Sequence, residues 1–267
     1  MNDRPIGIFD SGIGGLTVAR AIYERLPQEA TIYFGDTARV PYGPKSPDTV
    51  RRYSLEILRW LLGQGVKAVV IACNTSTEHA LELLRKESPV PVVGVIEPGA
   101  RAAVGAAKGG AIGVIGTAGT IHSNAYVRAI HALAPEARVE QQACPLFVPL
   151  VEEGWFDHPA AELIAQEYLA PLRDARVAAL VLGCTHYPLL KPLLRRVMGP
   201  DTALIDSAEE TARTLETTLH ESHLDAPPSP GAVAHRFAVS DDEPRFRQVG
   251  SRFIGEQLTG AEVVSLG

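Results

Sequence analysis

One phrase occurs twice in this chain of 267 residues. Residues 68–75 read AVVIACNT, and residues 179–186 read ALVLGCTH. Each segment is an apolar run of strand length that ends in a cysteine and is followed by small polar residues. Each cysteine is therefore expected at the C-terminal end of a buried strand, which is where open α/β sheets bind their ligands. The repeat predicts two similar α/β halves, each with one thiol at its ligand-binding edge.

A second pair of phrases supports this duplication. Residues 7–12 read GIFDSG, and residues 113–118 read GVIGTA. The glycines that open this pair are 106 residues apart, and the cysteines of the first pair are 111 residues apart. Strand-like runs alternate with helical patterns along most of the chain, and the pattern that follows the first repeated cysteine covers Thr77–Lys86. This alternation predicts mostly parallel sheets flanked by helices. We expect two domains related by a pseudo-twofold duplication, with an active site in the cleft between them.

The C-terminal tail has no counterpart in the repeat. It contains a Pro-rich stretch at 226–230, which predicts a loop, then a strand at His235–Val239 and a helix near Pro244–Gly255. The simplest arrangement returns this tail to the first half of the chain. The expected division is residues 1–97 with 208–267 as the first α/β domain, and residues 98–207 as the second.

Charge and hydropathy exclude several classes of protein. A net charge of −6 and a pI near 5.8 argue against a surface for nucleic acid or for an anionic membrane. No apolar run approaches the ~20 residues that a membrane-spanning helix needs, and the N-terminus lacks the pattern of a signal peptide. These features predict a cytoplasmic protein whose three cysteines are free thiols.

The two repeated cysteines are the best candidates for chemistry. Cys73 and Cys184 each precede polar residues that can cap a helix, and a helix N-terminus lowers the pKa of a thiol below its usual value of about 8.5. Cys144 lacks such neighbours and is expected to be a buried core residue. A redox pair is an alternative use of two thiols, although such pairs commonly have a C-x-x-C spacing that this sequence lacks. The sequence also has no closely spaced group of metal ligands, so we expect no metal.

A glycine-rich turn, DSGIGG, follows the first expected strand. Its spacing differs from the dinucleotide pattern G-x-G-x-x-G, and an aspartate at that point would repel a pyrophosphate. The glycines instead allow the backbone to approach a small ligand, with Ser11 donating and Asp10 accepting hydrogen bonds. A carboxylate beside a thiol would also raise the pKa of that thiol and strengthen the thiolate as a base. A tight, well-capped turn without a ligand is the alternative.

Three further loops carry polar candidates. The turn at 41–43, Pro-Tyr-Gly, could present backbone N–H groups to an anion, whereas Arg39 of the same loop is interpreted as a solvated charge. His186 follows the second repeated cysteine by two residues and could act as an acid, a base or a charge partner. The pattern around Glu152 and Glu153 indicates only surface charges.

Taken together, these motifs resemble the glutamate racemases, a family of cofactor-independent enzymes that supply D-glutamate for bacterial cell-wall peptidoglycan. The matching segments are residues 9–16 (FDSGIGGL), 33–37 (YFGDT), 41–43 (PYG), 72–75 (ACNT) and 183–190 (GCTHYPLL). The likeness covers roughly residues 6–207 and is weak beyond them. It implies a pair of α/β domains with the active site between them, glutamate as the substrate, no cofactor and a homodimer.

The resemblance also assigns roles to individual residues. Cys73 and Cys184 would transfer the protons, Asp10 would assist Cys73, and His186 and Glu152 would assist Cys184. Substrate contacts are implied at a wider set: Asp10, Ser11, Tyr42, Gly43, Asn74, Thr75, Thr185 and His186, together with Thr117 and Thr120 from the second copy of the first turn.

Such a reaction is physically reasonable without a cofactor. The α-hydrogen of an amino acid is very weakly acidic, so the protein must stabilise carbanion-like charge with backbone N–H groups and hydroxyls. One cysteine must enter as a thiolate and the other as a thiol. Racemisation of aspartate or of another acidic amino acid is an alternative within the same chemistry. A module that binds an amino acid without changing it is an alternative from another class.

Overall fold

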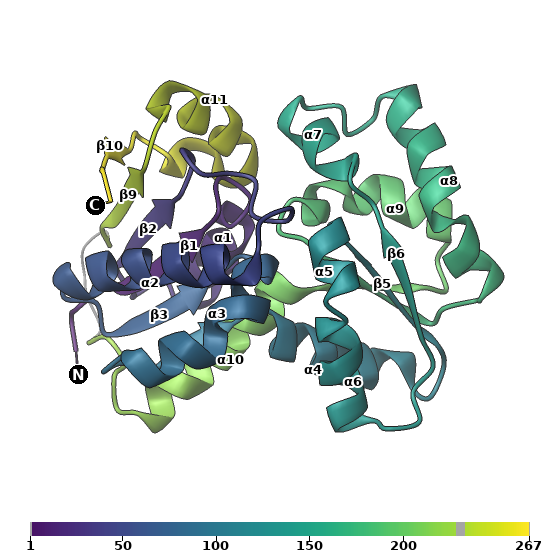
Figure 1. Ribbon diagram of the computed structural model, residues 1–267, viewed down its shortest axis with the longest axis horizontal. Helices are drawn as coiled ribbons and strands as arrows, with labels where there is room; N and C mark the ends of the chain where they lie inside the picture. Colours follow the sequence, from purple (N-terminus) through teal and green to yellow (C-terminus); the bar gives the residue numbers. More distant parts are fainter. Residues whose placement is uncertain (1, 228–232, 267) are drawn as a thin grey trace. The chain divides into compact units, whose positions relative to one another are not determined.

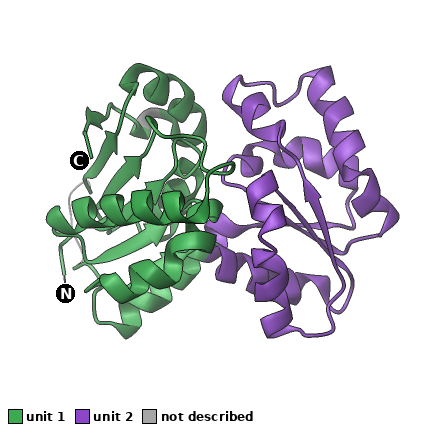
Figure 2. Ribbon diagram, in the orientation of Figure 1, with its two compact units in different colours: residues 1–95, 211–267 green, residues 96–210 purple. Residues whose placement is uncertain are grey.

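The computed structural model describes residues 2–227 and 233–266. The chain divides into two compact units, one formed by residues 1–95 and 211–267 and the other by residues 96–210 (Figure 2). The boundaries expected from the sequence were 97/98 and 207/208, and the folding of these units as separate domains stays a prediction. Most of the loop expected at 226–230 lies outside the described residues.

The first unit contains a six-stranded sheet in which every neighbouring pair is parallel. Its strands stand in the order β10-β9-β2-β1-β3-β4. Every residue of β1, β2 and β3 is buried, as expected for central strands of a parallel sheet that is covered on both faces. The strands are β1 (Ile6–Asp10), β2 (Thr31–Gly35), β3 (Ala68–Ile71), β4 (Val92–Gly94), β9 (His235–Val239) and β10 (Glu262–Val263).

Helices cover both faces of this sheet. Helices α2 and α3 pack together in front of it in Figure 1, while α1 packs against α11. Their apolar side chains join those of the strands in one core, in which Phe34, Leu58 and Val69 are almost completely buried. The helices are α1 (Leu16–Arg25), α2 (Pro47–Gly63), α3 (Asn74–Glu87), α11 (Glu243–Ile254), the short 3₁₀ helix η2 (Gly255–Gln257) and α10 (Ser207–Glu221), which begins in the second unit and continues in the first.

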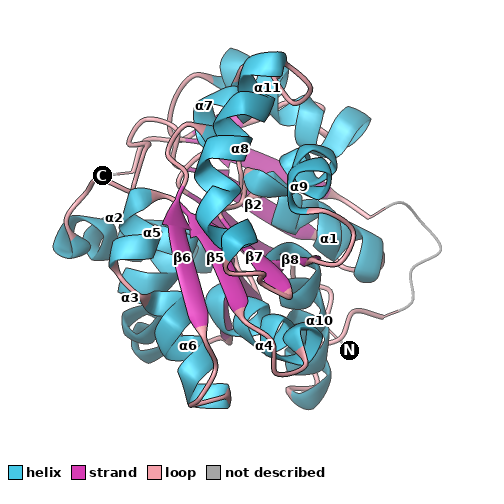
Figure 3. Cartoon of the chain, turned by 90° about the vertical axis from the view of Figure 1, so that its right-hand side faces the viewer, coloured by secondary structure: helices cyan, strands magenta, loops and turns pink. Residues whose placement is uncertain are grey.

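The second unit contains a four-stranded parallel sheet in the order β6-β5-β7-β8 (Figure 3). Its strands are β5 (Ile112–Gly116), β6 (Val139–Ala143), β7 (Ala179–Gly183) and β8 (Ala203–Asp206). Helix α4 packs against α6, and α8 packs against α9. The helical elements are α4 (Ile96–Ala107), α5 (Ala118–His122), α6 (Ala125–Leu133), α7 (Phe147–Glu152), α8 (Pro159–Asp174), η1 (Tyr187–Leu190) and α9 (Lys191–Met198).

The two sheets repeat one strand order. The order β2-β1-β3-β4 of the first unit is matched by β6-β5-β7-β8 in the second, so the predicted duplication of a parallel α/β fold is confirmed. Strands β3 and β7, which the repeated cysteines follow, occupy equivalent positions. Strands β9 and β10 are an addition to the first sheet: β9 pairs with β2, with His235 opposite Thr31. The C-terminal tail thus extends the sheet of the first unit.

The structure differs from the sequence-based expectation mainly in short elements. Helix α3 was expected to begin at Thr77, but it begins at Asn74, directly after the cysteine. The short elements α5, α7 and β10 were not predicted. The helices α5 and α7 have five and six residues, less than two turns, and the strand β10 has two residues, so none of them shows a periodic pattern. Among the described residues, no helix combines the length and apolar character needed to cross a membrane.

Candidate active site

Cys73 itself caps helix α3. It lies two residues beyond the end of β3, and the backbone N–H of Ser76 donates to its Sγ at 3.4 Å. The thiol in turn donates to the hydroxyl of Ser11 at 3.7 Å. Asn74 and Thr75 were expected to cap the helix, but they form its buried first turn. The strand end and the helix start together fix the sulfur at the carboxyl edge of the first sheet.

Asp10 lies at the same edge of the sheet, at the end of the neighbouring strand β1. Its side chain is almost completely buried, and its carboxylate accepts a hydrogen bond from the backbone N–H of Gly12 at 3.0 Å. A Cβ atom at Gly15 would stand 2.5 Å from that of Asp10, so only glycine allows this turn to fold so tightly. Burial, and next the charge of Asp10, raise the pKa of Cys73 to about 11. These effects outweigh the hydrogen bond from Ser76, which acts to lower that pKa.

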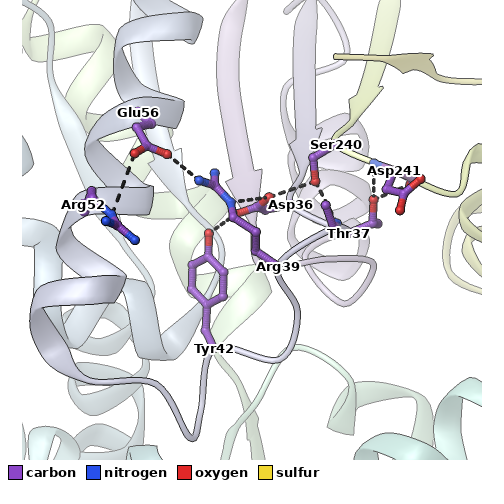
Figure 4. Close-up of polar contacts among 9 residues, drawn as sticks. Asp36, Thr37, Arg39, Tyr42, Arg52, Glu56, Ser240 and Asp241 are labelled. Carbon is purple, nitrogen blue, oxygen red and sulfur yellow. Dashed lines mark hydrogen bonds and ion pairs between the residues drawn. The ribbon is translucent and has the colours of Figure 1, made fainter. Parts of the chain in front are cut away.

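The loop after β2 is held by charged contacts. The buried hydroxyl of Tyr42 donates to the carboxylate of Asp36, so a substrate contact by Tyr42 would fall to its backbone. Arg39 was interpreted as a solvated charge, and this is wrong: its Nε donates to Asp36 at 2.7 Å, and its Nη1 pairs with Glu56 (Figure 4). Its guanidinium also lies 4.0 Å from the centre of the Tyr53 ring, which provides a cation–π contact.

Cys184 follows β7 directly and has a different set of neighbours. Its Sγ lies 3.9 Å from Nδ1 of His186, and Nε2 of the same ring lies 3.2 Å from a carboxylate oxygen of Glu152 at the end of α7. Thr185 and His186 are both buried. The chain then enters the 3₁₀ helix η1, while Glu152 reaches the same place from α7. The sulfur of Cys184, the ring of His186 and the carboxylate of Glu152 thus follow one another in a row.

The neighbours of His186 raise the pKa of its imidazole. Burial alone would lower the pKa of His186, but the hydrogen bonds to Cys184 and Glu152 and their charges outweigh burial and raise it to about 10. A raised pKa favours the positively charged form of the ring at neutral pH. The surrounding sequence pattern left Glu152 as a surface charge, and only the family resemblance pointed to it, whereas its neighbour Glu153 is exposed.

The remaining candidates fall at equivalent places. Thr117 follows β5, the counterpart of β1, and its hydroxyl accepts the backbone N–H of Thr120 at 3.3 Å while the two hydroxyls lie 3.1 Å apart. Gly43 is partly buried in the loop after β2.

Cys144 is fully buried, and its carbonyl accepts a hydrogen bond from Tyr187 at 2.9 Å. In the described part of the chain, no three His, Cys, Asp or Glu side chains gather in a way that could hold a metal ion.

Sequence reasoning missed the polar partners that hold the loop after β2. Asp36, Glu56 and Ser240 come from three separate parts of the chain and meet around Arg39 and Tyr42 (Figure 4). One signal was available, because Asp36 and Ser240 each directly follow a strand. Predicting their contact would have required knowing that β2 and β9 are neighbours in the sheet.

Comparisons with known proteins agree with this architecture. Residues 15–215 match the family Asp/Glu/Hydantoin racemase. The glutamate racemase of Geobacter metallireducens is 55% identical over 98% of this chain and 97% of its own length, and that of Neisseria gonorrhoeae is 51% identical over 99% and 97%. The crystal structure of a glutamate racemase from Francisella tularensis in complex with D-glutamate superposes with a TM-score of 0.92 at 39% identity, covering 100% of this chain and 99% of that one. Together, these matches and the repeated parallel fold show that the chain is a racemase and belongs to the Asp/Glu/Hydantoin racemase family.

Proposed function

We propose that this racemase interconverts L-glutamate and D-glutamate without a cofactor, using Cys73 and Cys184 as two acid–base groups on one α-carbon. The observation that supports this most strongly is the equivalent position of the two thiols. Each follows the same strand of a repeated sheet, and each has its own ionisable neighbour. Glutamate is favoured as the substrate because relatives about half identical over nearly their full length are glutamate racemases.

The proposed reaction moves one proton onto the protein and one off it. A thiolate removes the α-proton from one face and becomes a thiol, while the other thiol gives its proton to the opposite face and becomes a thiolate. The net charge of the pair is unchanged. Before the same enantiomer can react again, the thiol formed must lose its proton to solvent and the thiolate formed must regain one. By the resemblance, Cys73 takes the proton from D-glutamate and Cys184 takes it from L-glutamate.

Charge that develops on the substrate needs preorganised donors. Backbone N–H groups at the start of α3 and the hydroxyls beside the two cysteines are suited to this, because they lie at the carboxyl edges of the sheets and need no reorganisation. We assign substrate contacts to the set that the motifs indicate: Asp10, Ser11, Tyr42, Gly43, Asn74, Thr75, Thr117, Thr120, Thr185 and His186. Asp10 is proposed to assist Cys73, and His186 with Glu152 to assist Cys184.

The setting of the reaction is also a proposal. The two compact units are proposed to be two domains whose thiols act on the same substrate molecule. D-Glutamate made by the enzyme would supply peptidoglycan synthesis in the cytoplasm, and the enzyme would act as a homodimer. These statements rest on the family resemblance.

Isotope exchange tests the proposed reaction. Purified protein with a chelator and no added cofactor is incubated in deuterated water with either enantiomer of glutamate. We expect deuterium to enter the α-position and the solution to approach an equal mixture of enantiomers, as followed by NMR and polarimetry. Binding of glutamate without exchange would instead indicate a binding module. Faster exchange with aspartate than with glutamate would move the substrate to aspartate.

A further inference from the structure

The loop of residues 36–43, here called the substrate loop, is tied to the C-terminal tail. Strand β9 runs beside β2, and the backbone N–H of Ser240 donates to the carbonyl of Gly35, where the loop begins. The N–H of Ala38 donates to the hydroxyl of Ser240 at 2.8 Å. The N–H of Asp241 donates to the hydroxyl of Thr37 at 2.9 Å. The first residues of the loop are therefore bound to two consecutive residues of the tail.

The carboxylate of Asp36 links the tail to residues further along the loop. The hydroxyl of Ser240 donates to Oδ1 of Asp36 at 2.8 Å, while Oδ2 accepts from Arg39 at 2.7 Å and from the hydroxyl of Tyr42. The Asp36 side chain is completely buried, so these charge-assisted bonds are shielded from water and strong. One carboxylate thus connects the tail to the residue that adjoins Gly43.

The other side of the substrate loop is held by α2. Glu56 of that helix pairs with Arg39 and lies 4.0 Å from Arg52 (Figure 4). The Arg39 guanidinium also lies over the ring of Tyr53, 4.0 Å from its centre. The substrate loop is therefore held on one side by α2 and on the other by the C-terminal tail, both in the first unit. A loop held in its binding conformation before the substrate arrives pays less ordering entropy on binding.

We propose that Ser240, acting through Asp36, is a positioning residue that sets the backbone of Tyr42 and Gly43 for the substrate. The tail, which has no counterpart in the repeat, thereby serves substrate binding as well as the sheet. The proposal rests on the proposed function, because Tyr42 and Gly43 are assigned as substrate contacts there.

The test compares Ser240→Ala with the wild-type chain. Hydrogen–deuterium exchange of the free protein is followed by mass spectrometry. It should be faster in peptides that cover residues 37–43 of the loop and unchanged in peptides from the strands of the sheet. The KM for glutamate should rise about tenfold while kcat changes by less than about twofold, because a hydrogen bond to a buried charge is lost. Ser240→Thr keeps the hydroxyl and should restore both readouts. Ser251→Ala is the matched control, since that exposed serine donates its hydroxyl to the carbonyl of Gln248 in its own helix, α11, at 2.9 Å.

The possible outcomes separate this proposal from the proposed function. Loop exchange is measured without substrate, so a wild-type protein that fails to racemise glutamate would refute the proposed function and leave the exchange result standing. Unchanged loop exchange and an unchanged KM in Ser240→Ala would overturn the positioning role, even if the melting temperature fell. If Ser240→Ala does not fold, Ser240→Cys keeps a side chain of similar size with a weak donor and is expected to show the same loop exchange and rise in KM.

Discussion

The two repeated cysteines have the same place in the fold and opposite electrostatic neighbours. Cys73 and Cys184 follow equivalent strands of two sheets with one strand order. Next to Cys73 stands a buried carboxylate, Asp10, which together with burial raises the pKa of that thiol to about 11. Next to Cys184 stands the ring of His186, which Glu152 helps to keep protonated. The two halves thus share the position of the thiol and differ in the ionisable group beside it.

This difference suits a pair of groups that must start in different states. The surroundings of Cys73 favour a neutral thiol, whereas the sulfur of Cys184 lies 3.9 Å from Nδ1 of His186, a ring whose pKa is raised. We therefore expect the resting enzyme to hold a neutral thiol at Cys73. The predictions below can break or sharpen this comparison.

The largest effect is expected from removing either repeated thiol. Cys73→Ala and Cys184→Ala should each lower the rate of racemisation by about 10³-fold or more, because each thiol is the only proposed proton carrier for its face. Circular dichroism should show a retained fold. Cys144→Ala is the matched control and should keep most of the activity. Strong activity in either of the first two variants would refute the two-thiol account.

Replacing the imidazole should affect one half of the reaction. We expect His186→Asn to lower kcat/KM by about 10²-fold, since the ionisable ring beside the Cys184 sulfur is lost. The enantiomers have equal free energy, so kcat/KM must fall equally in both directions. The isotope effect separates the halves: α-deuterated L-glutamate should show a larger effect than in the wild type, and α-deuterated D-glutamate a smaller one. The opposite change would place His186 on the other half of the reaction.

A smaller effect is expected at the carboxylate behind the ring. Glu152→Gln should lower kcat/KM by about tenfold, because the bond that orients and charges the ring is weakened. The upper limb of the pH–rate profile should move to lower pH, since loss of the carboxylate lets the imidazolium release its proton sooner. Glu153→Gln changes the same residue type one position away on the exposed surface and should leave the profile in place. Equal effects at both positions would remove the special role of Glu152.

The smallest effect is a shift in the pH at which Cys73 reacts. With its pKa raised to about 11, Cys73 should be alkylated slowly by iodoacetamide near pH 8 and faster as pH rises towards 11. Asp10→Asn removes the negative charge that disfavours the thiolate, so this rise should begin at lower pH. Mass spectrometry of the peptide that contains Cys73 measures both. A profile that stays unchanged, or moves to higher pH, would show that Asp10 does not act on this thiol.

Much of the fold could be predicted because its signals are local. Each central strand is a continuous apolar run that ends in a polar or glycine-rich turn, and the strand at His235–Val239 was expected at the bounds observed. The start of α3 was placed three residues too late, since Asn, Thr and Ser are weak helix formers. The cap formed by the preceding cysteine, together with burial of the first turn, outweighs that weak propensity.

The polar contacts could not be predicted because they join distant parts of the chain. Arg39 looked solvated in the sequence, yet the fold brings Asp36 and Glu56 to its guanidinium. Ser240 reaches Asp36 only because β9 pairs with β2. A pattern within one segment carries no information on such pairs, so they appear only once the sheet order is known.

The most direct test of the account compares the two halves in matched variants. The isotope effect on kcat/KM is measured for Cys73→Ser and Cys184→Ser with each enantiomer of α-deuterated glutamate. If each thiol faces its own side, Cys184→Ser should show the larger effect with L-glutamate and Cys73→Ser the larger effect with D-glutamate. The same isotope effects in both variants, for both enantiomers, would contradict the assignment of one thiol to each face.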